Sequence, residues 1–154
     1  MHLQDVMAAS RRVHAAIDSI DALISQHLGV QRSDLRCLNL LEHGPVTAGE
    51  IAARIGLTSG SVTALVDRLE RAGFVERRRS STDRRSVEVA IPDAAFGRIA
   101  PLYRQVGQAV MGQFSSMEAD ALAQAGETLA AFAGALEAAA AGLAPGPRPE
   151  GDAP

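Results

Sequence analysis

Residues 47–91 read TAGEIAARIGLTSGSVTALVDRLERAGFVERRRSSTDRRSVEVAI, and the spacing of residue types in this stretch decides the fold. Thr47 stands three residues before Glu50, a spacing typical of a helix start because each side chain can bind the other's backbone N–H. Gly56 interrupts the helical pattern, and Thr58 can cap a second helix by accepting a first-turn N–H. The stretch therefore predicts two short helices joined by a tight turn.

The second predicted helix has an apolar side and a small, polar side. Its apolar residues recur at i, i+3, i+4 and i+7, which is the spacing of a buried stripe: Val62, Leu65, Val66 and Leu69. The other side begins with Ser59, Gly60, Ser61 and Thr63. Small side chains at a helix N-terminus let the backbone closely approach a phosphate or the floor of a groove.

An Arg-rich hairpin is predicted after the second helix. Apolar and other residues alternate along 87–91 with the period of a β-strand. Residues 76–85 contain five Arg and two acidic residues, a local charge of 5 − 2 = +3, whereas the whole chain carries −3. A cationic hairpin on an acidic protein indicates a polyanion as its partner. We therefore predict a winged helix-turn-helix within residues 32–91 that binds double-stranded DNA.

Long helices are expected on both sides of this region. Residues 3–28 carry a heptad-like seam of apolar side chains, which is typical of a helix that packs against another helix. Ser33 is the expected N-cap of the short helix that follows. Another helix is expected to begin at residues 92–93, with a kink at Pro101 because proline removes a backbone hydrogen bond.

The last helix is expected to start from a capping box formed by Ser115 and Glu118. Its leucines recur at every seventh position, the pattern of a helix–helix seam: Leu122, Leu129, Leu136 and Leu143. We therefore predict a mainly α-helical homodimer in which residues 1–31 and 92–143 form the dimerisation region. The Pro-rich segment 144–154 is expected to be disordered.

The composition argues against several classes of protein. The chain contains no Lys, which excludes a phosphate-loop Lys or a Schiff-base Lys and leaves guanidinium groups for basic contacts. No His-Glu-x-x-His, Gly-x-Ser-x-Gly or Gly-x-Gly-x-x-Gly motif occurs. We therefore expect no enzyme activity, no catalytic residue, no cofactor and no metal site.

The cysteine content and the hydropathy pattern indicate the cell compartment. Cys37 is the only cysteine, so no intramolecular disulfide can form, and a small buried apolar residue is its expected role. The first residues, MHLQDVMAASRR, lack the apolar core of a signal peptide. No uninterrupted apolar run reaches membrane length. A cytoplasmic protein with no membrane partner is therefore expected.

Two segments, LTSGSVTALVDRLERAGFVER (57–77) and DRRSVEVAI (83–91), resemble the MarR family of bacterial transcriptional regulators. The order of predicted elements is similar to that family over residues 3–143. The resemblance implies a homodimer joined by its first and last helices, with a recognition helix in the major groove and a wing in the flanking minor groove. It implies a ligand-responsive repressor that binds a pseudo-palindromic operator. The alternative is a winged-helix module that docks a protein without binding DNA.

The predicted DNA contacts combine the residue pattern with this resemblance. At the matched positions Arg85 enters the minor groove and Asp83 braces it, since a nearby carboxylate orients a guanidinium. Arg68 either contacts a phosphate or joins Asp67 in structural pairs with the wing or a neighbouring helix. The full predicted set is Thr47, Thr58, Ser59, Gly60, Ser61, Thr63, Arg68, Arg78, Arg79, Asp83, Arg84 and Arg85.

The resemblance also implies a small aromatic or phenolic effector, bound where the DNA-binding region meets the dimerisation helices. His14 and Tyr103 are the candidate residues of such a pocket, and the alternative for Tyr103 is packing alone. Family members that sense oxidants carry a Cys near the N-terminus, whereas Cys37 lies in the second predicted helix. Its position therefore does not support oxidant sensing.

Overall fold

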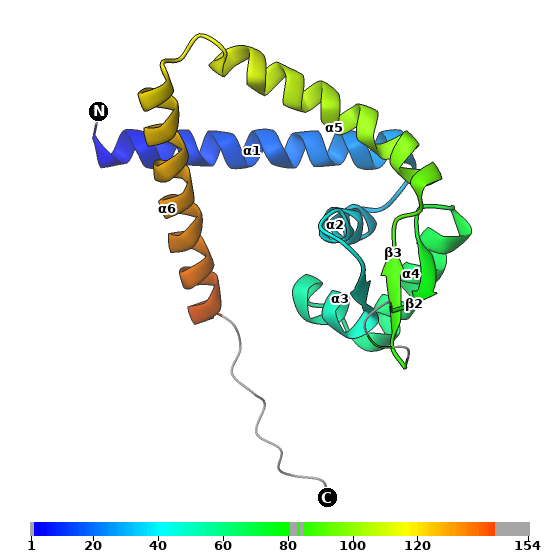
Figure 1. The fold of residues 1–154 in the computed structure, drawn as a ribbon. Helices are drawn as coiled ribbons and strands as arrows, with labels where there is room; N and C mark the ends of the chain where they lie inside the picture. The colour runs from blue at the N-terminus through cyan, green and yellow to red at the C-terminus, as the bar shows by residue number, and fades with distance from the viewer. Residues whose placement is uncertain (1, 81–82, 84, 144–154) are drawn as a thin grey trace, which may run out of the picture. The chain divides into compact units, whose positions relative to one another are not determined.

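The computed structural model describes residues 2–80, 83 and 85–143, so the predicted disordered tail lies outside the described residues. The chain is mainly helical with one small sheet, as predicted (Figure 1). The elements in chain order are α1 (Leu3–Leu28), α2 (Arg32–Leu41), β1 (Val46–Thr47), α3 (Ala48–Ile55), α4 (Ser59–Arg71), β2 (Glu76–Arg79), β3 (Val87–Ala90), α5 (Asp93–Phe114) and α6 (Ala119–Leu143).

The predicted helix-turn-helix is α3 and α4, and its start signals act as expected. Thr47 Oγ1 accepts the backbone N–H of Glu50 at 3.3 Å, and the Glu50 carboxylate accepts that of Thr47 at 2.7 Å. Gly56 ends α3 with a φ of 75°, a left-handed conformation that favours glycine. Thr58 Oγ1 then accepts the N–H of Ser61 at 3.3 Å and so caps α4.

The core is built around the apolar side of α4. All four residues of the predicted stripe are buried, in one cluster with side chains from α2, α3, β3 and the start of α5. Phe74, just beyond α4, is among the largest fully buried side chains. Burying each such side chain contributes roughly 2 kcal/mol, so this cluster fixes which side of α4 faces solvent.

The sheet is antiparallel in the order β1-β3-β2, and β2 with β3 forms the wing. The predicted alternation places Val87 and Val89 on the buried side of the strand and Ala90 on the other side. Val89 is buried as predicted, but Val87 is 54 % exposed and Ala90 is buried. Val87 pairs with Arg79 at the outer end of the hairpin, where no core residue covers it. Ala90 pairs with Glu76 at the inner end, next to the core.

Two predicted helix caps are wrong. α2 begins one residue before Ser33, because the Asp34 carboxylate accepts the backbone N–H of Gln31 at 3.0 Å and makes Gln31 the N-cap. Ser115 lies in the turn before α6, where its hydroxyl donates to the carbonyl of Gly112 at 2.9 Å. At α2 the carboxylate of Asp34 stabilises an earlier start, and at Ser115 the hydroxyl bonds the preceding helix, so sequence spacing alone does not select the cap.

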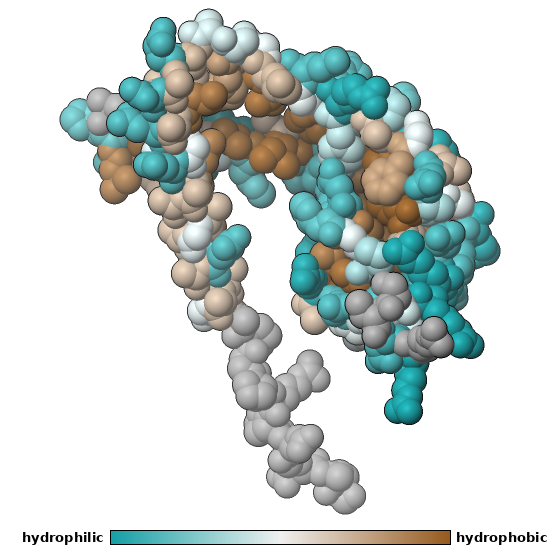
Figure 2. Space-filling model, in the orientation of Figure 1, coloured by the Kyte–Doolittle hydropathy of each residue, from teal (hydrophilic) through white to brown (hydrophobic). Residues whose placement is uncertain are grey.

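The chain divides into two compact units, residues 1–106 and residues 107–154. The core described above belongs to the first unit. In the second unit none of the residues up to 143 is buried, and the four heptad leucines of α6 are 48 to 84 % exposed. The space-filling view shows neutral and hydrophobic residues along the visible face of α6 (Figure 2). This helix therefore carries an uncovered apolar stripe.

Candidate nucleic-acid interface

The exposed side of α4 presents short polar side chains at the start of the helix. Ser59, Gly60, Ser61 and Thr63 are all exposed, as the sequence predicts for a surface that faces a partner. The Thr63 hydroxyl donates to the carbonyl of Ser59 at 3.1 Å, and the hydroxyls of Thr58 and Ser61 lie 2.9 Å apart. These local bonds restrain the hydroxyls, and each hydroxyl oxygen retains capacity to accept a hydrogen bond.

The wing places guanidinium groups beside this helix. Arg78 and Arg79 lie on β2 and are exposed, and Arg85 is exposed in the turn that leads to β3. These three side chains form no ion pair with any residue that the structure describes. Arg84, which was predicted to join them, lies outside the described residues. The result is a group of exposed wing guanidinium groups that form no ion pair with a described carboxylate, although Glu88 lies opposite Arg78 on the neighbouring strand.

The predicted brace between Asp83 and Arg85 acts on the backbone. The Asp83 carboxylate accepts the backbone N–H of Arg85 at 3.0 Å, so the described hydrogen bond of this pair involves the main chain of Arg85. The backbone N–H of Asp83 in turn donates to the Ser80 hydroxyl at 3.3 Å, and Ser80 is buried. Aspartate in turns commonly accepts the backbone N–H of the residue two positions later in the chain. The Asp83 carboxylate therefore stabilises the tight turn that carries the Arg85 side chain.

Arg77 connects the wing to α4, a role that sequence analysis missed. Its guanidinium donates to Asp67 at 2.5 Å and also binds Glu70, while its backbone N–H donates to Glu70 at 3.3 Å. The hydrogen bond that the Arg77 guanidinium donates to Asp67 is the main cause that raises the pKa of Arg77. The Asp67 side chain thus pairs with the wing, which confirms one of the two alternatives for that residue. The only sign of this ion pair in the sequence is an acidic residue and an Arg ten positions apart, a spacing that predicts no contact.

Arg68 pairs with a neighbouring helix. Its Nε and Nη2 donate to the two carboxylate oxygens of Asp34 on α2, at 3.0 and 2.5 Å. This geometry confirms the structural-pair alternative for Arg68, and the phosphate contact stays an untested prediction. Arg36 of the same helix donates to the carbonyl of Ile55 at 3.3 Å, so α2 contacts the ends of both α3 and α4.

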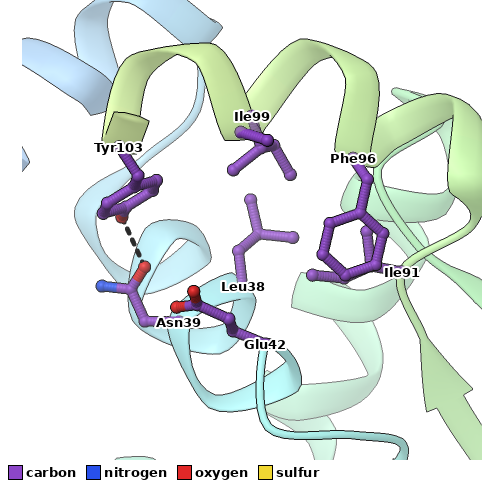
Figure 3. A pocket seen from close by; sticks show the side chains of 8 residues that line it. Leu38, Asn39, Glu42, Ile91, Phe96, Ile99 and Tyr103 are labelled. Atoms are coloured by element: carbon purple, nitrogen blue, oxygen red, sulfur yellow. Dashed lines mark hydrogen bonds between the residues drawn. The ribbon is translucent and has the colours of Figure 1, made fainter. Parts of the chain in front are cut away.

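A pocket lies between α2, β3 and α5 in the first unit, and its volume is about 190 Å³ (Figure 3). The Tyr103 hydroxyl donates to the Asn39 side-chain carbonyl at 2.5 Å. The carboxylate of Glu42 is the only charged group on the wall. The lining residues are Leu38, Asn39, Glu42, Ile91, Phe96, Ile99, Ala100 and Tyr103. The predicted pocket residue Tyr103 is therefore present, whereas His14 is exposed on α1 and does not line it.

Cys37 is fully buried in the core cluster, as expected for a small apolar residue. Burial raises the pKa of its thiol to about 11, and the negative charge of Asp34 adds to the shift. A thiol with a raised pKa stays protonated at neutral pH and is a poor nucleophile.

Two features are absent from the part of the chain that the structure describes. None of its helices is long and apolar enough to cross a membrane. Within the same residues no group of three His, Cys, Asp or Glu side chains is arranged to hold a metal ion.

Comparison with known proteins matches the region just described. Residues 28–86 match the model of the MarR family, which confirms the resemblance predicted from the sequence. A Bacillus subtilis protein named uncharacterized HTH-type transcriptional regulator YcgE is 44 % identical over 88 residues, which cover 56 % of this chain and 57 % of the relative. The chain thus spans little more than half the length of that relative.

Solved structures share the fold. The crystal structure of RV1404 from Mycobacterium tuberculosis superposes with a TM-score of 0.68 at 20 % identity, covering 88 % of this chain and 94 % of that chain. A MarR family protein from Bacillus stearothermophilus superposes with a TM-score of 0.65 at 19 % identity, covering 89 % and 99 %. At these identities the likeness concerns the winged-helix architecture alone.

The burial of Cys37 leads to a testable prediction. At pH 8 the thiol of the folded protein is almost entirely protonated, because that pH lies far below its raised pKa of about 11. Iodoacetamide is expected to alkylate the native protein at least roughly 100-fold more slowly than the urea-unfolded protein, whose thiol titrates near its ordinary value. Mass spectrometry of timed samples measures both rates. Equal rates in the two states would contradict the burial and the protonated thiol.

Proposed function

We propose that this chain, whose residues 28–86 match the model of the MarR family, is a homodimeric transcriptional regulator that binds a pseudo-palindromic operator. The observation that carries the proposal is the pair of surfaces formed by the exposed wing guanidinium groups, which have no described ion pair, and the exposed polar start of α4, on two elements that Arg77 joins. An exposed guanidinium row adjacent to small polar side chains is suited to phosphates and base edges. Val87 is the one exposed large apolar side chain among the described residues of 46–91, which is little apolar surface for a docked protein.

In the proposed complex α4 enters the major groove and the wing reaches the adjacent minor groove. The start of α4 is the end that can approach base edges, because its exposed side chains are short. Arg85 leaves the turn at the tip of the wing, where a narrow minor groove has an enhanced negative potential. The Arg77 bridge to Asp67 and Glu70 keeps these two contact surfaces at a constant spacing.

The uncovered leucine stripe of α6 supports a homodimer. A strict heptad with exposed leucines is an unfavourable surface in water and a favourable seam against another helix. The seam on α1 contains further exposed apolar residues, including Val13 and Ile17. Two-fold symmetry would place two copies of α4 about one helical turn of DNA apart. Repression would follow from occupation of a promoter, and the dimer is the unit that recognises both half-sites.

The pocket beside Tyr103 supports a small effector, and its wall favours a neutral or cationic aromatic group over an aromatic acid. A cavity of about 150 Å³ holds one benzene ring, so this pocket has room for one substituted ring. Glu42 is its only charged lining residue, and both Asp21 and Glu42 contribute to the raised pKa of Tyr103 after burial. A carboxylate ligand would meet a negative potential there. Bound ligand would act by shifting α2 and α5, which changes the separation of the two copies of α4.

The Arg85→Ala variant tests the DNA contact. We expect its affinity for duplexes selected from a random pool to fall by about 1–3 kcal/mol, while its thermal unfolding is unchanged, because Arg85 is exposed. Arg104→Ala is the matched control, since it removes an exposed Arg from α5 and should keep the affinity of the parent. Fluorescence anisotropy at fixed salt measures both. Equal affinity of the parent and Arg85→Ala would remove Arg85 from the interface.

Salt dependence separates this function from a protein-docking module. A DNA-binding wing predicts that log affinity for duplex falls linearly with log salt concentration, because each neutralised phosphate releases counterions. A docking module would bind no duplex.

The dimer proposal predicts that charge in the leucine stripe separates the protomers. The double variant Leu129→Glu/Leu136→Glu is expected to sediment as a monomer at micromolar concentration, because it places carboxylates in an apolar seam. Val87→Glu is the control, since Val87 is a similarly exposed apolar residue on the wing. Analytical ultracentrifugation measures the mass of each. A dimer that survives the double substitution would show that α6 is not the seam.

The effector proposal predicts the charge preference of the pocket. Benzylamine is expected to bind at least about fivefold more tightly than benzoate, with benzyl alcohol between them, because charges interact through the partly screened field of Glu42. Tyr103 is the only Tyr and the chain has no Trp, so its fluorescence reports on the pocket. Glu42→Gln should weaken the preference, because the negative charge of Asp21 remains. Tighter binding of benzoate to the parent protein would reverse the assignment.

A further inference from the structure

The pair formed by Asp34 and Arg68 differs from the other ion pairs of the described residues in its burial. The Asp34 side chain is 1 % exposed, whereas the carboxylates of the other pairs are 41 to 56 % exposed. Its oxygens accept three N–H groups, one from the backbone of Gln31 and two from Arg68. A buried carboxylate is costly unless such bonds satisfy it, so the position of Arg68 is tightly defined.

Arg68 is on the same helix as the predicted base contacts, and its side chain is 38 % exposed. A free Arg at this place has a long, mobile side chain that reaches solvent and any phosphate near α4. Such a contact would increase affinity for every sequence equally, because phosphates carry no sequence information. Asp34 holds the guanidinium against α2 instead and neutralises its charge.

The cations of the winged helix-turn-helix differ in their pairing. Arg68 on α4 and Arg77 on β2 are each paired with carboxylates. Arg78, Arg79 and Arg85 on the wing form no ion pair with any described residue, and the same holds for the exposed Arg54 on α3 and Arg71 on α4. The ion pairs thus occupy the guanidinium groups of Arg68 and Arg77 and leave these others exposed.

We infer that Asp34 is a specificity-determining positioning residue, which rests on the proposed DNA binding. It withholds the Arg68 guanidinium from the DNA backbone and fixes the orientation of α4 on α2. Removal of the carboxylate frees one cation per chain next to the groove. Binding to unrelated DNA then increases, and the discrimination between operator and unrelated DNA decreases. A purely structural role of the pair would weaken binding to both.

The experiment compares the parent protein, Asp34→Asn, Arg68→Gln and the double variant Asp34→Asn/Arg68→Gln. Each is titrated with a duplex selected from a random pool and with a random-sequence duplex of the same length, over a series of salt concentrations. Circular dichroism and thermal unfolding establish that each variant is folded. The double variant is the matched control, because it keeps the shape of the pair without its charges.

We expect Asp34→Asn to bind the random duplex roughly fivefold more tightly at about 0.1 M salt, with the slope of log affinity against log salt steeper by about 0.9 per chain. Its ratio of selected to random affinity falls. Arg68→Gln and the double variant keep the slope of the parent, because Arg68 neutralises no phosphate in the parent.

Two results would overturn the inference. A flatter slope for Arg68→Gln would show that Arg68 contacts a phosphate in the parent. A folded Asp34→Asn that leaves both the slope and the random-duplex affinity unchanged would show that no cation is withheld. If Asp34→Asn does not fold, the inference is judged by the salt slopes of Arg68→Gln and of any folded double variant. Slopes equal to that of the parent support the inference, and a flatter slope overturns it. A parent that binds no duplex overturns the proposed function and this inference with it, whereas a binding parent with unchanged variants overturns the inference alone.

Discussion

Burial of the apolar side of α4 is the constraint on which the rest of the structure depends. The four stripe residues and Phe74 form the centre of one cluster to which α2, α3, β3 and α5 contribute. Since a helix has two sides, fixing the buried one also fixes the exposed one. The short polar residues at the start of α4 are therefore held toward solvent by the packing of residues on the opposite side.

Polar contacts set the finer position of the same helix. Arg68 is held by α2, Arg77 connects the wing to Asp67 and Glu70, and Arg98 stacks on Phe74 at 4.0 Å while donating to the carbonyl of Ala72. These bonds link α4 to three other elements. Because hydrogen bonds to charged groups are directional, they define the orientation of the helix more narrowly than apolar packing alone.

The two units of the chain differ in what they leave uncovered. The first unit has a buried apolar core and a cationic edge. The described part of the second unit has an exposed apolar stripe on α6 and no buried residue. Water solvates a cationic edge well, whereas exposure of an apolar stripe to water is unfavourable. The two surfaces therefore suit different partners. The proposed function assigns DNA to the first and a second copy of the chain to the other.

Local patterns in the sequence determined the helix-turn-helix. The caps at Thr47 and Thr58, the left-handed Gly56, the stripe of α4 and the charge of the wing all depend on neighbours within a few positions. The same reasoning failed at Ser33, where Asp34 caps an earlier start, and at Ser115, whose hydroxyl bonds the carbonyl of Gly112 in the preceding helix.

Only the tertiary structure decided which groups meet across the chain. Arg68 and Asp34 are 34 positions apart, and Tyr103 and Asn39 are 64 apart. No periodicity connects such residues, because their proximity is produced by packing of α2 against α4 and α5. The charge of the pocket wall and the pairing of Arg68 follow from that packing. Sequence spacing therefore predicted the surface that is proposed to bind DNA, and the tertiary structure decided that Arg68 and Arg77 are paired with carboxylates.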